Sequence, residues 1–99
     1  MVDYRWEVEK RHRSMTPDEQ AAYYKGLKLK CEEIIEKYGH KDSVLKQYLE
    51  EVIWAVDRIL PDVDKSTHYG HCGDWETGLY FLQEAEAKLW PYLEERAKQ

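Results

Sequence analysis

Apolar residues recur at alternating intervals of three and four along most of this chain, and no other feature limits its fold so strongly. A helix turns once every ~3.6 residues, so this spacing gathers the apolar side chains into one stripe along the helix. Three segments carry it, at 16–39, 42–60 and 75–97. Their stripes are Tyr24, Leu27, Cys31, Ile34 and Tyr38; Leu45, Tyr48, Val52, Ala55 and Ile59; and Leu79, Leu82, Ala85, Leu89 and Leu93. Because each stripe must be buried, the sequence predicts an all-α fold.

Local signals mark the ends of these helices. Thr16 precedes Pro17 and stands three residues before Glu19, which is the pattern of an N-cap with a capping box. Gly39 supplies a stop for the first helix. Asp42 or Ser43 can then cap the second helix.

The later boundaries depend on prolines and an aspartate. Pro61 ends the second helix, and a loop follows over residues 61–74. Asp74 can cap the third helix, over 75–97. Pro91 removes a hydrogen bond inside that helix, so we expect a kink or a restart near it.

The connection around Gly39 is short enough to make the first two helices antiparallel. Three helices with such connections predict a small up-down-up three-helix bundle, and 99 residues suffice for one domain. Residues 1–14 form an N-terminal arm or a short extra helix. Val2, Tyr4, Trp6 and Val8 alternate with charged residues as in a strand, but a helix is favoured because a lone strand leaves its backbone hydrogen bonds unmet.

The net charge of −5 is unevenly distributed and excludes some partners. Residues 1–49 hold 10 basic and 9 acidic side chains, whereas residues 50–99 hold 5 and 11. An acidic half argues against nucleic-acid binding and would suit a basic partner. No apolar run reaches the ~18 residues of a membrane span and the N-terminus is charged, so we expect a cytoplasmic protein.

The loop 61–74 contains the residues that come nearest to a metal site. His68, His71 and Cys72 can each bind zinc, with His40 or Cys31 as a fourth ligand, although the spacing matches no closed zinc finger. A calcium loop is excluded because Thr67 and Gly73 replace its glycine and its glutamate. A helical di-iron site is excluded because the chain lacks paired Glu-x-x-His motifs.

We expect no catalytic residues. Cys72 follows a histidine, but adjacent side chains in a loop usually point apart, and the chain has no serine-nucleophile elbow and no phosphate-binding glycine loop. No cofactor is expected. Zinc remains only as part of the metal-binding alternative.

Aromatic residues supply the remaining signal. The chain has 8 tyrosines and 4 tryptophans but 1 phenylalanine, a choice that favours rings with a polar group, which are enriched at interfaces. The predicted contacts for a partner are Tyr4, Trp6, Val8, Trp54, Tyr80 and Tyr92. We therefore expect a non-enzymatic helical protein-interaction module, acting as a homodimer or as a small inhibitor, immunity or adaptor protein. The alternative is a zinc-binding or thiol-based regulatory protein that uses His68, His71, Cys72 and Cys31.

Overall fold

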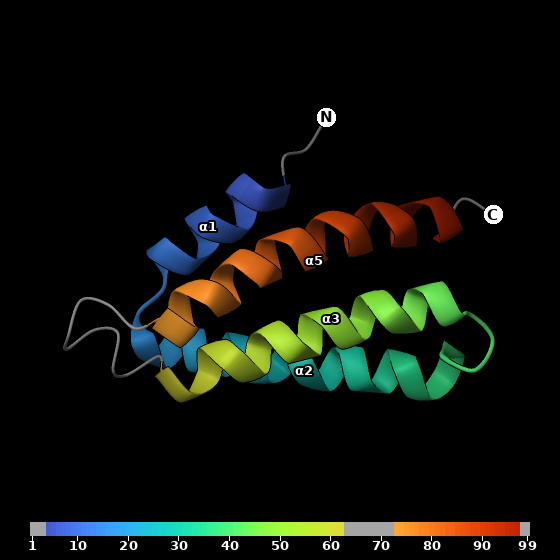
Figure 1. The fold of residues 1–99 in the computed structure, drawn as a ribbon, viewed down its shortest axis with the longest axis horizontal. Coiled ribbons are helices and arrows are strands. Elements are labelled where there is room, and N and C mark those ends of the chain that lie inside the picture. The colour runs from blue at the N-terminus through green and yellow to red at the C-terminus, as the bar shows by residue number, and fades with distance from the viewer. Residues whose placement is uncertain (1–3, 63–72, 98–99) are drawn as a thin grey trace.

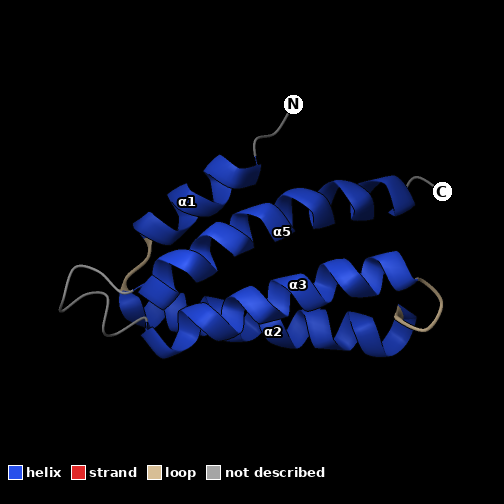
Figure 2. Cartoon of the chain, in the orientation of Figure 1, coloured by secondary structure: helices blue, strands red, loops and turns tan. Residues whose placement is uncertain are grey.

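The computed structural model describes residues 4–62 and 73–97. Within these ranges the chain forms four α-helices and one 3-10 turn, and contains no strand (Figure 2). The elements are α1 (Tyr4–Ser14), α2 (Pro17–Tyr38), α3 (Ser43–Ile59), η1 (Leu60–Asp62) and α5 (Gly73–Ala97). The predicted all-α class is confirmed.

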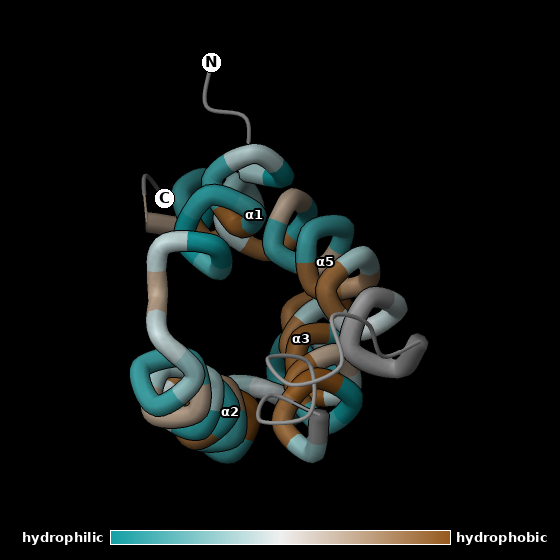
Figure 3. The backbone as a smooth tube through the Cα atoms, turned by 90° about the vertical axis from the view of Figure 1, so that its left-hand side faces the viewer, coloured by the Kyte–Doolittle hydropathy of each residue, from teal (hydrophilic) through white to brown (hydrophobic). Residues whose placement is uncertain are grey.

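The helices pack in the order α1, α5, α3, α2. The most extensive interface joins α3 to α5, α2 packs on the other side of α3, and α1 packs mainly on α5. Figure 1 shows α2 and α3 running in opposite directions and α5 returning beside α3. The end-on view in Figure 3 shows the same succession and the largely hydrophilic character of α1. None of the helices in the described ranges is long and apolar enough to cross a lipid bilayer.

Both predicted ends of α2 are present. The Thr16 hydroxyl accepts a hydrogen bond from the Glu19 N–H at 3.3 Å, and the Glu19 carboxylate accepts one from the Thr16 N–H at 3.2 Å. Gly39 follows the last residue and donates its N–H to the carbonyl of Ile35 at 2.7 Å. Its backbone is right-handed, with φ of −60°, so the left-handed turn typical of glycine is absent. A Cβ at Gly39 would lie 2.6 Å from the Ile35 carbonyl oxygen, and this close approach is what requires glycine.

Asp42 caps α3 and also joins the start of α3 to the end of α5. One carboxylate oxygen accepts the Leu45 N–H at 3.1 Å. The other accepts the Tyr92 hydroxyl at 2.7 Å and forms an ion pair with Arg96. The Tyr92 ring also contacts Tyr48 edge to face, with 5.5 Å between centroids. The last turns of α5 are therefore held to the start of α3.

Most of the core lies along the predicted stripes, and Val8, Leu49 and Val56 add to it from outside them. Thirteen hydrophobic residues are buried in one cluster: Val8, Tyr24, Leu27, Cys31, Leu45, Leu49, Val52, Ala55, Val56, Ile59, Leu82, Ala85 and Leu89. Tyr38 is the exception among the predicted inner residues, because it is 48% exposed. It is the last residue of α2, so no following turn of its own helix covers it.

The third predicted helix ends at Ala97 as expected but differs from expectation at its start and at Pro91. It begins at Gly73, so Asp74 lies inside α5 rather than before it. It continues through Pro91 to Ala97 as one helix, so of the two alternatives at Pro91 the restart is wrong and the kink stays a prediction. Proline removes only one backbone hydrogen bond, and the buried Leu89 and partly buried Leu93 on either side hold both turns against the core. At Gly78 helix α5 approaches α3 so closely that a Cβ would lie 2.7 Å from Ile59 Cγ1.

Candidate functional site

Three exposed aromatic side chains meet where α3 and α5 pack together. Trp54 is 43% exposed, Tyr80 58% and Phe81 42%. The Trp54 and Phe81 rings meet edge to face with centroids 4.9 Å apart, and Tyr80 meets Phe81 in the same manner at 5.6 Å. We call these three residues the aromatic patch. Edge-to-face contacts fix the rings relative to one another, so the patch presents a preformed apolar surface to solvent.

The aromatic patch lines a groove of about 490 Å³ that also includes charged side chains of both helices. The Lys88 ammonium lies 3.4 Å from the Glu51 carboxylate across the groove. Glu84 accepts two hydrogen bonds from the guanidinium of Arg5 on α1, at 2.7 and 3.1 Å. An apolar centre with a charged rim is the usual composition of a protein-binding surface.

Arg58 places a cation over the Trp54 ring. Its guanidinium carbon lies 4.8 Å from the centroid of a Trp54 ring, within the range of a cation–π interaction. This contact covers part of one ring face and helps to hold the indole in place.

The structure brings together two of the six predicted partner contacts, Trp54 and Tyr80. Phe81, which lies between them, was missed because the prediction favoured rings with a polar group. Phe81 lies outside the apolar stripe of α5, and this position in the sequence could have indicated an exposed ring. Tyr92 is elsewhere, bound to Asp42 at the other end of α5.

The three predicted contacts on α1 have different environments. The prediction for Val8 is wrong, because Val8 is 1% exposed and belongs to the core. Helical geometry places it one turn before His12, and these are the two buried residues of α1. Tyr4 is partly buried, and its hydroxyl donates a hydrogen bond to the Glu94 carboxylate at 2.5 Å. Trp6 is 55% exposed.

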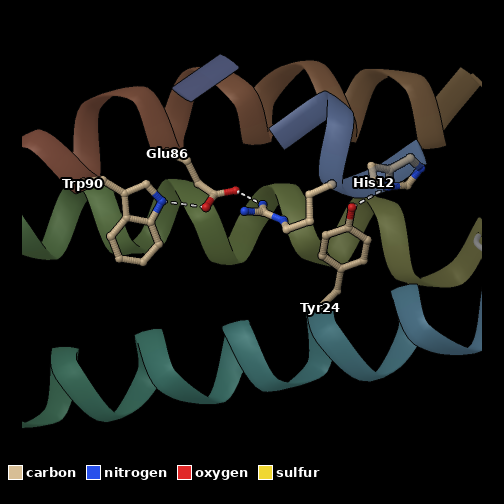
Figure 4. A network of polar contacts seen from close by, with 5 residues as sticks. His12, Tyr24, Glu86 and Trp90 are labelled. Atoms are coloured by element: carbon tan, nitrogen blue, oxygen red, sulfur yellow. Dashed lines mark hydrogen bonds and ion pairs between the residues drawn. The ribbon is translucent and has the colours of Figure 1, made fainter. Parts of the chain in front are cut away.

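A second cluster, a buried polar network, lies between α1, α2 and α5 (Figure 4). The Glu86 side chain is fully buried, although glutamate is almost never buried without a partner. Its carboxylate accepts the Trp90 indole N–H at 2.6 Å and a guanidinium N–H of Arg11 at 2.7 Å. The Arg11 guanidinium carbon also lies 4.5 Å from the ring centroid of Tyr23.

Beside these residues lies a second buried hydrogen bond, made by His12, which is 2% exposed. Its Nδ1 is hydrogen-bonded to the hydroxyl of Tyr24, as Figure 4 shows. Gln20 donates its amide to the carbonyl oxygens of His12 at 2.9 Å and Met15 at 3.2 Å, which fixes the connection from α1 to α2. Burial, and then the nearby charges of Arg13 and Arg11, lower the pKa of His12 to about 4. The imidazole is therefore neutral at pH 7.

This pKa predicts that acid destabilises the protein through His12. Between pH 6.5 and about 4 the unfolded chain takes up a proton at His12 that the folded chain does not, so the free energy of unfolding falls as the pH falls through this window. We expect His12 to contribute up to about 3 kcal/mol of this loss. Urea titrations at several pH values measure it. His12→Gln should flatten the dependence of the free energy of unfolding on pH. A slope equal to that of the wild-type protein would contradict the prediction.

The candidate metal ligands are not brought together in the part of the chain that is described. His68, His71 and Cys72 lie outside it. Cys31 is 1% exposed in the core, and burial raises its pKa to about 11, so the thiol stays protonated at pH 7. Residues 4–62 and 73–97 contain no group of three or more His, Cys, Asp or Glu side chains placed to hold a metal ion.

Comparisons with known protein families, with curated proteins and with solved structures find no match to this chain.

Proposed function

We propose that this chain is a non-enzymatic protein-interaction module: an up-down-up bundle of α2, α3 and α5, with α1 as an additional helix. The aromatic patch of Trp54, Tyr80 and Phe81 is its contact surface. The observation that carries this proposal is the fixed, edge-to-face arrangement of three exposed rings in one groove.

The energetics of binding favour such a surface. Large rings held in place lose little conformational freedom when a partner covers them, and aromatic residues supply most interface hot spots. The ion pair of Lys88 with Glu51 lies at the rim, where it can exclude water and set specificity without being buried. The acidic C-terminal half of the chain favours a partner with a basic surface.

Two forms of the interaction fit this surface. The chain acts either as a homodimer or as a small inhibitor, immunity or adaptor protein that covers part of a larger partner. The zinc-binding or thiol-based alternative is less favoured, because the burial of Cys31 in the core keeps its thiol away from solvent.

The expected result of Trp54→Ala or Tyr80→Ala is a loss of about 2 kcal/mol or more in binding, the usual scale for truncating an interface anchor. Sedimentation of the purified protein over a range of concentrations measures self-association. Calorimetric titration with a partner isolated from the native host measures binding to another protein.

The matched control is Leu29→Ala, which truncates a side chain that is 61% exposed on α2, away from the groove. It should leave both kinds of association unchanged. The proposal fails if the wild-type protein stays monomeric and its partner binds both groove variants with wild-type affinity. A loss seen with Trp6→Ala alone would place the contact surface on α1 instead.

A further inference from the structure

The guanidinium of Arg11 occupies a site that is built by other helices. Glu86 and Trp90 lie one turn apart on α5, and Tyr23 lies on α2. The Trp90 indole N–H, at 2.6 Å, orients the Glu86 carboxylate, and Arg11 binds the other carboxylate oxygen at 2.7 Å. The Tyr23 ring supplies a face for the cation, 4.5 Å from the guanidinium carbon. Carboxylate and aromatic face together are suited to a planar guanidinium.

Burial makes this site selective. The Glu86 side chain is fully buried, so its charge has no access to water and requires a cation. An ammonium group can supply the charge. It cannot, however, stack on Tyr23 as a planar guanidinium does.

Helix α1 holds Arg11 in this site with few other buried contacts. Val8 and His12 are its buried residues, and an 11-residue helix is marginal in water by itself. Its bonds to α5 through Arg5 and Tyr4 lie at the surface. The Nε of Arg11 is buried without an acceptor in the part of the chain that is described. Because one donor is left unsatisfied, Arg11 fills the site imperfectly.

We propose that Glu86, Trp90 and Tyr23 form a guanidinium-binding site, which α1 fills with its own Arg11 and which accepts an arginine side chain of another polypeptide when α1 is displaced. The site uses α2 and α5 and does not include the aromatic patch. Substitutions of Trp54 therefore test the two proposals separately.

Chemical rescue tests the selectivity of the site. Arg11→Ala removes the side chain beyond Cβ, and N-ethylguanidine replaces the missing atoms. At millimolar concentration it should raise the Tm of the Arg11→Ala protein by about 4 °C or more, by mass action on the folded state. Ethylamine at the same concentration should raise it much less. The indole N–H resonance of Trp90, assigned with Trp90→Phe, should shift on addition of N-ethylguanidine because its acceptor carboxylate is then occupied.

Two controls show whether Glu86 is the receptor. The Arg11→Ala, Glu86→Gln double variant lacks the carboxylate charge and should show no rescue. Arg5→Ala loses an exposed ion pair with Glu84 and should show none either. If Arg11→Ala is unfolded at 25 °C, N-ethylguanidine should restore its helical circular dichroism. In that case the Trp90 indole resonance can be measured in the Arg11→Lys protein, which retains a cation at this position. The proposal is overturned if N-ethylguanidine and ethylamine act equally, or if Glu86→Gln leaves the rescue intact.

A peptide tests binding of a second polypeptide. A synthetic peptide of residues 4–14, added to the full-length Arg11→Ala protein, should shift the Trp90 indole resonance and raise the Tm. The same peptide with glutamine in place of Arg11 should do neither. If the two peptides act alike, the site does not take arginine from another chain.

Discussion

Replacing Leu82 with alanine is expected to lower the free energy of unfolding by about 2–5 kcal/mol. Leu82 is fully buried on α5, in the hydrophobic cluster that includes residues of α3. Truncation removes apolar contacts and leaves a cavity that the surrounding helices can close only in part. Chemical denaturation monitored by circular dichroism measures the loss.

Glu95→Ala is the matched control on the same helix. Glu95 is exposed on α5, so its truncation should change the free energy of unfolding by less than about 0.5 kcal/mol. Similar losses for the two variants would show that Leu82 does not lie in the core.

Arg11→Ala is expected to cost about 3–5 kcal/mol, because it leaves the fully buried Glu86 carboxylate without its cation. Glu86→Gln should cost less. The amide oxygen can still accept the Trp90 indole N–H, and the Arg11 side chain, which is 29% exposed, retains access to water. Urea denaturation at pH 7 measures both changes.

Arg5→Ala provides the comparison with an exposed ion pair. The Arg5 side chain is 57% exposed beside Glu84, so its loss should cost no more than about 1 kcal/mol. If Arg11→Ala costs as little as Arg5→Ala, the buried network contributes no more to stability than a surface ion pair.

The spacing of apolar residues predicted the helical class because the period of an apolar stripe is a local property that can be read from the sequence. Helix ends that are capped by residues close in the sequence can be predicted for the same reason. The capping box of Thr16 and Glu19 and the cap at Asp42 are local, and all three residues behave as predicted. The further bonds of Asp42 to Tyr92 and Arg96 join residues about fifty positions apart, and no local pattern indicates them.

The buried polar network was missed because the predicted helix stripes were built from apolar residues and from tyrosines alone. Glu86 lies four residues after Leu82 and three before Leu89, so the helical period itself placed it on the inner face. Its cation, Arg11, is 75 residues away in the sequence. The partner of a buried charge depends on tertiary packing, which periodicity does not encode.

The prediction of partner contacts grouped Tyr4, Trp6 and Val8, although these three residues do not share one face of a helix. Tyr4, Val8 and His12 recur every four residues, which is the period that α1 uses. On that helix Val8 turns toward the core, whereas Trp6 lies on the exposed surface. The aromatic patch was predicted in part, since Trp54 and Tyr80 stand outside the best-defined stripes, but their meeting around Phe81 depends on how α3 crosses α5.

The position of α1 has a kinetic consequence. Helices α2 and α3 are neighbours along the chain, so their pairing closes a short loop and can form early. The pairing of α1 with α5 joins segments that are far apart in the sequence. The surface on which α1 packs is complete only after α5 has packed on α3. We therefore expect α1 to join last during folding and to detach first during unfolding, so that its backbone amides exchange with solvent well before those of α3.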